Sequence, residues 1–469
     1  MAVSANQRPE GKSLLIFMSM LISSIVASFL STALNTALPA MIETLSVDVD
    51  TGQWITSGFS LAMGIVMPLT AFLITRFPTK RLYLCGLVLF VGGSVLCALS
   101  NSFVLLMIGR VLQAASNGIL VAMTQVVILS IFPKEKQGSY MGWYGLAVSA
   151  APMVAPTLGG LLVDAFGWRS IFWIVAAVMM LSFVFALFVF ENVLDVKDTK
   201  FDTLSFIISI FAFGGITLGV GRLSSKGITD PLTAVCLGLG LAASVLFVLR
   251  QLKADEPFLN IRTLKYRNYA ISVAGSVVLY LVMMGGTVLT PLYLQRVAGM
   301  SAAVSGLLTL PGSLLSIICS PIAGKLYDRL GMRKLFLFGG ALFLLGNIGM
   351  VFPEPLPVLV VFYALRSAGI SFLMMPFVTW GIAGIGDKGQ TAHGTALLTS
   401  LRTIAGAIGT AVFVGVMSSS SESAKGLASA NPGLFGFRMA ALAMSAVAAL
   451  MFIAGLALIR ENEGEKKKS

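Results

Sequence analysis

A largely apolar run that covers residues 103–131 contains the charged Arg110 and the amides Gln113, Asn117 and Gln125. A charge at mid-bilayer costs about 2.5–3.5 kcal/mol even on insertion scales, so such residues usually face the protein interior and have a function. Positions 110, 113 and 117 follow the i, i+3, i+7 spacing of one helix face. The pattern predicts a polar stripe that points into a cavity. The alternative is an arginine that bonds backbone carbonyls for structural reasons alone.

The composition indicates an integral membrane protein, since 57% of residues are hydrophobic, only 11% are charged and the mean hydropathy is +0.92. Soluble domains carry about 25% charged residues. Fourteen apolar runs are long enough to cross a bilayer as helices. They cover residues 14–37, 52–74, 82–100, 103–131, 139–163, 170–190, 202–221, 230–250, 268–291, 301–324, 335–352, 356–384, 395–417 and 436–459. The four cysteines lie inside these runs without a second ligand nearby, so we expect no metal and no cofactor.

The positive charge of the chain, +12, is explained by its placement between the runs. If the N-terminus is inside, about 23 of the 32 Lys and Arg residues lie in inner segments and about 6 in outer ones. The positive-inside rule then places both termini in the cytoplasm of a multi-pass protein of the cell membrane. We expect no nucleic-acid partner, because no basic patch is interleaved with exposed aromatic residues.

The chain contains a duplicated unit of six helices. The loop GKLYDRLGMRK at 324–334 has an echo, AFLITRFPTKR, 253 residues earlier, and Arg110 has an echo in Arg366 after 256 residues. The small residues of the fifth and thirteenth runs repeat after 254 residues. Such repeats around a midplane cavity are typical of transporters. The predicted division is a cytoplasmic N-terminus (1–12), a six-helix bundle (13–190), two linking helices with a cytoplasmic loop (191–267), a second six-helix bundle (268–459) and a basic tail (460–469).

The loop at 324–334 has residues suited to hold two helices together. Gly324 lets helices approach, and Asp328 can cap a neighbouring helix or pair with an arginine. Gly331 provides a turn, and the basic residues of the loop, Arg329 and Arg333 among them, keep it at the cytoplasmic surface. The echo keeps Arg76 but has Thr75 and Pro78 where the second copy has the acid and the glycine. A loop that serves only topology is the alternative.

The fifth run has small residues four positions apart, Ala151, Ala155 and Gly159, followed by Gly160. Small residues at this spacing allow close helix contact. Pro152 and Pro156 each remove a backbone hydrogen bond and bend the helix. The pattern predicts a kinked, tightly packed helix at the interface between the halves.

Together the paired loops, GRVLQAASNG and APTLGG resemble the major facilitator superfamily. LNTALPAMI, WITSGFSLAMGIVMP, DAFGWRSIF, PLYLQRVAGMSAAVSGLLTLPG and LRTIAGAIGTAVF resemble its fourteen-helix drug:proton antiporter branch. The resemblance implies an all-α fold of two six-helix bundles plus two extra central helices, and multidrug efflux in exchange for protons. It also implies that Arg110 is tied to proton coupling, that the fifth-helix motif prevents leak, and that the 324–334 loop is a latch for the outward-open state.

One departure concerns the proton carrier, which is normally a buried carboxylate with a shifted pKa. Leu30 stands where members of that branch often have an acid, and no Asp or Glu lies clearly at mid-span. The carrier is then Asp164 or Asp328, with or without His393, or coupling is of another kind. Without a carboxylate beside Arg110, neutral, amphipathic and anionic substrates all stay open. The predicted cavity face contains Arg402, Ser31, Asn35, Trp54, Gln113, Asn117 and the bend at 374–376.

The sequence therefore predicts an exporter of small amphipathic drugs or toxic compounds that works by alternating access as a monomer in the lipid bilayer. Alternatives are an exporter of an endogenous lipid or metabolite, and a receptor or scaffold on a transporter fold. An enzyme is not expected, because the chain has no Walker-type Gly-Lys-Ser/Thr loop and no HExxH motif.

Overall fold

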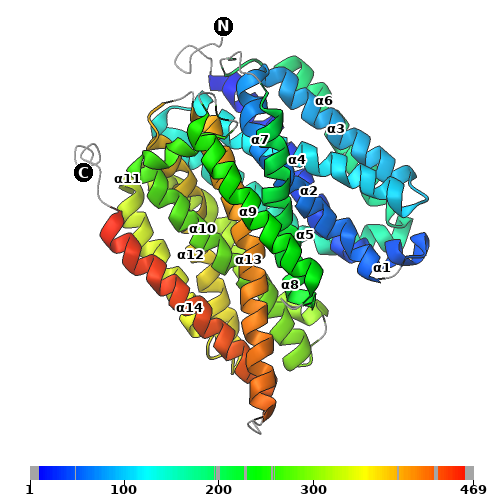
Figure 1. Cartoon of the computed structure of the whole chain (residues 1–469), viewed down its shortest axis with the longest axis vertical. Helices are drawn as coiled ribbons and strands as arrows, with labels where there is room; N and C mark the ends of the chain where they lie inside the picture. The colour runs from blue at the N-terminus through cyan, green and yellow to red at the C-terminus, as the bar shows by residue number, and fades with distance from the viewer. Residues whose placement is uncertain are drawn as a thin grey trace.

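A computed structural model describes residues 10–47, 49–194, 196, 201–226, 230–254, 257, 259–300, 302–387, 390–426 and 431–459. These residues form helices and connecting segments and no strand, as Figure 1 shows. The helices are α1 (Glu10–Leu45), α2 (Val49–Arg76), α3 (Thr79–Leu99), α4 (Phe103–Ile131), α5 (Lys134–Phe166), α6 (Arg169–Val189), α7 (Thr203–Ser209), α8 (Gly215–Lys226), α9 (Pro231–Lys253), α10 (Arg267–Leu292), α11 (Ala302–Gly349), α12 (Leu356–Ala383), α13 (Thr391–Gly426) and α14 (Pro432–Leu458), with short π or 3-10 segments at Ile210–Gly214, Ile261–Lys265 and Tyr293–Val297.

Polar caps determine where several of these helices begin. The side chain of Ser102 accepts a hydrogen bond from the backbone N–H of Leu105, and Asp230 and Asn431 do the same for Thr233 and Leu434. Each cap satisfies one of the N–H groups that have no partner inside the helix. The long apolar runs therefore start at the polar residues that interrupt them.

Twelve helices in the described part of the chain are long and apolar enough to cross a membrane. The fourteen spans expected from the sequence are not confirmed. Two features account for the difference. The 33-residue α5 is not among the twelve, and the 48-residue α11 counts once although Gly331, at φ 75° and ψ 176°, interrupts its helical backbone. An L side chain rarely adopts this conformation, so a glycine is suited to the turn.

The helices form two groups, with α7, α8 and α9 between them in sequence. In Figure 1, α1 to α6 lie on one side of the molecule and α10 to α14 on the other, with α7, α8 and α9 in front. Within the first group α3 packs on α4 and α6, and α1 packs on α5. Within the second, α11 packs on α12 and α10 on α13. The proposed domain bounds themselves stay predictions.

The two groups share one apolar core, and its residues from the second group lie at the end of the molecule where α1 starts and α14 ends, which we call the termini end. This core contains Phe17 near the start of α1, Tyr269 near the start of α10 and Ala396 near the start of α13. The halves are therefore packed against each other at the termini end.

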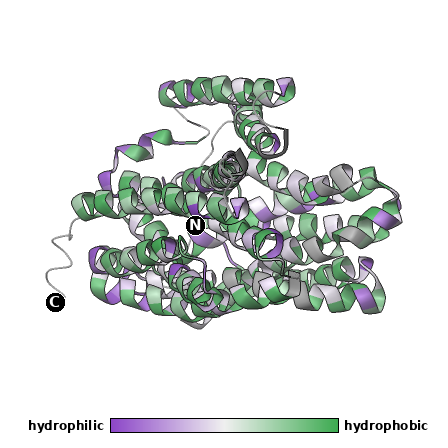
Figure 2. Cartoon of the chain, turned by 90° about the horizontal axis from the view of Figure 1, so that it is seen from below, coloured by the Kyte–Doolittle hydropathy of each residue, from purple (hydrophilic) through white to green (hydrophobic). Residues whose placement is uncertain are grey.

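The outward faces of the helices are apolar. On α9 few residues are buried, and Leu239, Leu241 and Val245 are each more than half exposed. Figure 2, seen from below the view of Figure 1, shows hydrophobic residues over almost every helix. Water would not stabilise such a surface, whereas lipid tails would.

Candidate functional site

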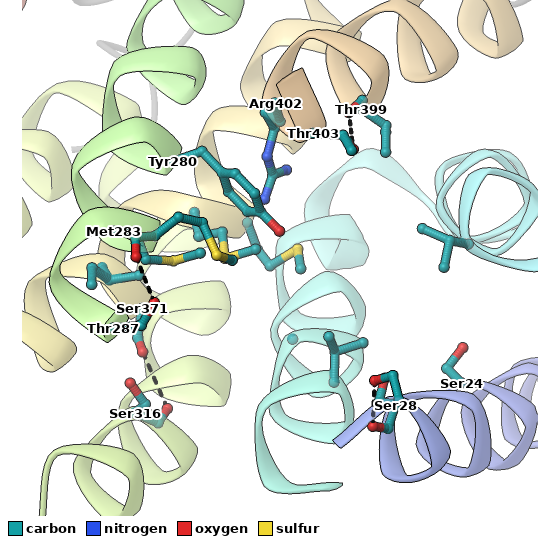
Figure 3. A pocket seen from close by; sticks show the side chains of 18 of the residues that line it. Ser24, Ser28, Tyr280, Met283, Thr287, Ser316, Ser371, Thr399, Arg402 and Thr403 are labelled. Atoms are coloured by element: carbon teal, nitrogen blue, oxygen red, sulfur yellow. Dashed lines mark hydrogen bonds between the residues drawn. The ribbon is translucent and has the colours of Figure 1, made fainter. Parts of the chain in front are cut away.

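A cavity of about 700 Å³ lies between the two halves. Side chains of α1, α2, α4 and α5 line it on one side, and side chains of α10, α11, α12 and α13 line it on the other. Serines, threonines, methionines and aromatic residues make up most of the wall, and Figure 3 shows part of it. The lining residues include three arginines, Arg110, Arg366 and Arg402, but no Asp, Glu or His. The described wall of the cavity is therefore positively charged.

Arg110 is held by the helix next to its own. It is 1% exposed, its Nε donates to the carbonyl of Ile55 at 3.0 Å, and its NH1 donates to Gln113 Oε1 at 2.8 Å. The guanidinium also lies 4.2 Å from the ring centroid of Phe59. These contacts satisfy much of the buried charge and tie α4 to α2.

The predicted polar stripe on α4 is only partly present. Asn117 lines the cavity, where its Nδ2 contacts Met63 Sδ at 3.5 Å. Gln113 is fully buried and does not line the cavity, because its Nε2 donates to Ser94 Oγ of α3 at 2.9 Å. Gly93 of α3 makes this approach possible, since a Cβ there would lie 2.9 Å from Gln113 Cγ. Gln113 thus accepts a hydrogen bond from Arg110 and links it to α3.

Arg366 lines the cavity from the second half and is also 1% exposed. Its Nε donates to Asn347 Oδ1 at 3.2 Å, and its NH2 donates to the carbonyls of Val282 and Met283, both at 2.9 Å. Gly286 leaves room for the guanidinium, with which a Cβ would clash. The cavity face predicted from the sequence does not include Arg366. Its offset of 256 from Arg110 was the signal that could have placed it there.

Arg402 differs from the other two arginines. It is 5% exposed, lines the cavity, and its guanidinium carbon lies 4.8 Å from the ring centroid of Tyr280. Among the described residues no acceptor forms a hydrogen bond with it. Figure 3 shows the side chain of Arg402 extending from α13 beside Tyr280 of α10, across the cavity from Ser24 and Ser28 of α1.

None of the predicted proton carriers lines the cavity. Asp164 is exposed in the last turn of α5. His393, at the start of α13, accepts a hydrogen bond at its Nδ1 from the backbone N–H of Asn260. Asp328 lies toward the termini end, at a contact between α5 and α11. Of the other residues predicted for the cavity face, Ser31, Met374 and Met375 line it, the 38%-exposed Trp54 does not, and the side chain of Asn35 lies outside the described residues.

The contact between α5 and α11 joins the halves on the side of the cavity that faces the termini end. We call it the α5/α11 contact. The carboxylate of Asp328 accepts hydrogen bonds from the backbone N–H groups of Gly138 and Ser139, at 2.9 and 2.7 Å, and from Ser139 Oγ at 2.6 Å. Both residues lie near the N-terminus of α5, where the helix dipole stabilises negative charge. The sequence proposed either a neighbouring helix or an arginine as the partner of Asp328. In the structure the partner is the neighbouring helix, α5.

Glycines let the two backbones of the α5/α11 contact touch. A Cβ on Gly324 would clash with the carbonyl oxygen of Gly138, and a Cβ on Gly142 would lie 2.7 Å from the carbonyl oxygen of Ser320. Gly145 and Ser320 also line the cavity, so the α5/α11 contact directly adjoins the cavity. The sequence reading missed the glycines of α5, although their spacing in GSYMGWYG is the small-xxx-small signal of close helix packing. Arg329 and Arg333 are exposed near this contact and Arg76 is partly exposed.

The motif of the fifth helix lies farther along α5. Ala155 is fully buried in the core that contains residues of α1, and Ala151 and Gly159 are also buried. A Cβ on Gly160 would meet no atom within 4 Å, so packing does not require this glycine. The side chains of Pro152 and Pro156 lie outside the described residues. The backbone contact between the halves that the structure describes on α5 is at Gly138 to Gly145, nearer the helix start than the predicted motif.

Comparison with known proteins identifies the family. A profile of the Major Facilitator Superfamily matches residues 20–410. The chain belongs to this family. It is 33% identical over 461 residues to the uncharacterised MFS-type transporter YcnB of Bacillus subtilis, covering 98% of this chain and 97% of YcnB. It is 32% identical to the lincomycin resistance protein LmrB of the same organism, covering 88% of this chain and 87% of LmrB. The crystal structure of the transporter FucP in the outward conformation superimposes with a TM-score of 0.64 at 15% identity, over 96% of this chain and all of FucP. That likeness shows the fold.

Proposed function

We propose that the protein is a secondary transporter that exports amphipathic drugs or toxic compounds across the cytoplasmic membrane by alternating access. The observation that supports this best is the placement of the cavity. Both halves line it, and the α5/α11 contact lies between it and the termini end. An alternating-access transporter requires a central site with a contact between its halves on one side that can open.

Several finer features belong to the same proposal. We place both termini in the cytoplasm, which makes the termini end the cytoplasmic end and the described conformation outward-facing. We also propose fourteen spans, with α11 counted as two helices that meet at Gly331 and α5 as a further one. The family and the likeness to LmrB, a lincomycin resistance protein, support export of drug-like compounds.

We propose that protons drive export through Asp328. The described cavity wall has no carboxylate or imidazole, so the proposal places the proton carrier outside it. The Asp328 carboxylate accepts three hydrogen bonds across the α5/α11 contact. Protonation would remove the charge that these bonds and the start of α5 stabilise, and would favour opening of the termini end.

The test is transport in proteoliposomes with an imposed pH gradient, using ethidium, lincomycin and the anionic dye carboxyfluorescein as probes. We expect gradient-dependent movement of at least one probe, and we expect Asp328→Asn to abolish the dependence on the gradient. Movement that is the same with and without a gradient would contradict proton exchange. Failure to move any probe, with binding retained, would favour an endogenous lipid or metabolite as cargo, or a receptor or scaffold that does not transport.

A further inference from the structure

Among the charged groups of the cavity, Arg402 alone is left without a hydrogen-bond acceptor in the described structure. Arg110 and Arg366 each donate to backbone carbonyls and to a side-chain amide. Arg402 is also buried, at 5% exposure, yet in the described structure its guanidinium contacts the face of the Tyr280 ring and no hydrogen-bond acceptor. The Arg402 guanidinium carries five N–H donors in a rigid fork, and its nitrogens are not enclosed, so they remain accessible from the cavity.

The surroundings of Arg402 do not neutralise it. The lining residues of the cavity contribute three positive charges and no negative one. Three positive charges in a site of low dielectric create a positive potential. This potential raises the local concentration of anions. The guanidinium fork matches the two oxygens of a carboxylate, and it also suits sulfonate or phosphate groups.

Nearby groups fit the remainder of such a ligand. Tyr144 lies within electrostatic reach of Arg402, and Gln125, which is 4% exposed and lines the same cavity, has an Oε1 without a donor among the described residues. Met283, Met284 and Met374 supply a soft apolar wall, which adapts to ligands of different shape. At about 700 Å³ the cavity is of a size that takes a drug-sized molecule rather than an inorganic ion alone.

We propose that the cavity selects amphipathic organic anions, and that Arg402 binds the anionic group while the methionines and aromatic residues hold the apolar body. The proposal names the substrate class of the proposed exporter. Its statement about binding is independent of that function, and only the role of binding in transport rests on it. Arg110 and Arg366 contribute positive potential, because their own hydrogen bonds hold them against α2 and α10. Arg402 makes the direct contact.

The test uses two ligands that share one skeleton. The anion 1-anilinonaphthalene-8-sulfonate and the neutral N-phenyl-1-naphthylamine differ by the sulfonate, which stays charged over the usable pH range. Binding of each tritiated ligand to the purified full chain is measured by scintillation proximity, which reports protein-bound ligand. We expect the anion to bind at least tenfold more tightly than the neutral compound.

Three variants separate charge recognition from folding. Arg402→Gln should lower affinity for the anion at least tenfold and change affinity for the neutral compound less than twofold. Arg402→Lys keeps the charge without the fork and should lose less. The matched control is Arg222→Gln, which removes an arginine of α8 that pairs with Asp230 at 3.0 Å and does not line the cavity, and it should change neither affinity.

Two results would overturn the inference. One is equal affinity of the two ligands in the unaltered chain, or an affinity for the anion that Arg402→Gln leaves unchanged. The other is that Arg402→Gln and Arg402→Lys each weaken binding of the anion and of the neutral compound to the same extent. That result would assign Arg402 a structural role. Because the assay measures binding without a gradient, selective binding together with failed transport would refute the proposed function and leave the anion site standing.

Discussion

The two halves meet through two pairs of helices that the internal repeat relates, and these contacts are built differently. In the α5/α11 contact, Gly138 and Gly142 bring backbone against backbone at Gly324 and Ser320, and a carboxylate crosses between the helices. In the related contact between α2 and α13, an offset of 253 places Ala71 at the position of Gly324. An offset of 254 places Ala392 and Ala396 at the positions of the two glycines of α5.

The polar part of the α5/α11 contact is also missing from the α2/α13 contact. Thr75 occupies the position of Asp328, and its hydroxyl donates to the carbonyls of Ala71 and Phe72 in its own helix. Ala71, Ala392 and Ala396 all belong to the apolar core at the termini end. The α2/α13 contact is thus held by apolar packing, whereas the α5/α11 contact depends on one charge. Protonation of Asp328 would weaken the α5/α11 contact, whereas the described core residues Ala71, Ala392 and Ala396 of the α2/α13 contact carry no ionisable group.

The largest expected effect comes from filling the glycine contact. Gly324→Ala should force α5 and α11 apart, because the new Cβ would clash with the Gly138 carbonyl. Overpacking of this kind costs about 1–3 kcal/mol, which would shift the balance between closed and open termini end by a factor of about 5 to 150. Spin labels on the exposed Arg81 and Lys334, in a background without the native cysteines, would report the distance between the halves at this end.

The matched control for that variant lies on the same helix. A Cβ on Gly306 would meet no atom within 4 Å, so Gly306→Ala should leave the distance distribution unchanged. If the two substitutions changed the distribution alike, close packing at Gly324 would not be what holds the termini end closed.

A smaller effect is expected when the charge alone is removed. Asp328→Asn keeps the shape of the side chain but replaces an ionised acceptor, and hydrogen bonds to charged groups contribute about 1.5–3 kcal/mol each against about 1 kcal/mol for neutral ones. We expect the ratio of closed to open molecules to fall about tenfold in the same distance measurement. We also expect this ratio to stop responding to pH. Thr75→Val, the matched change in the α2/α13 contact, should have no effect, since Thr75 bonds only its own helix in the contacts described. An equal response to both changes would refute the contrast between the contacts.

The sequence predicted the long helices and the cavity positions of Arg110 and Asn117 because both depend on local patterns. A span follows from an uninterrupted apolar run, and Arg110 and Asn117 follow from helical spacing within one run. The side to which Gln113 turns was not predictable, because it depends on Gly93 and Ser94 of another helix. Likewise, the missing acceptor of Arg402 is visible only when eight helices are placed around one cavity.

The glycines of α5 were missed for a related reason. Their spacing is a signal of close packing, but it does not name the partner, and the motif of Ala151 to Gly159 gave the same signal on the same helix. The structure separates the two. Gly138 and Gly142 lie against α11 of the other half, whereas Ala155 lies in the core together with residues of α1.

The smallest effect is expected from giving the α2/α13 contact a glycine of its own. Ala71→Gly removes one fully buried methyl group and adds backbone freedom, and a glycine inside a helix costs about 1 kcal/mol relative to alanine. We expect a slightly lower melting temperature in detergent and an unchanged distance between the halves, because Ala71 packs among apolar residues of the core. Ala71→Ser, which keeps a Cβ, is the control and should stay nearer to the unaltered chain. A tighter termini end in Ala71→Gly would mean that glycine alone, without Asp328, is enough to bring the halves together.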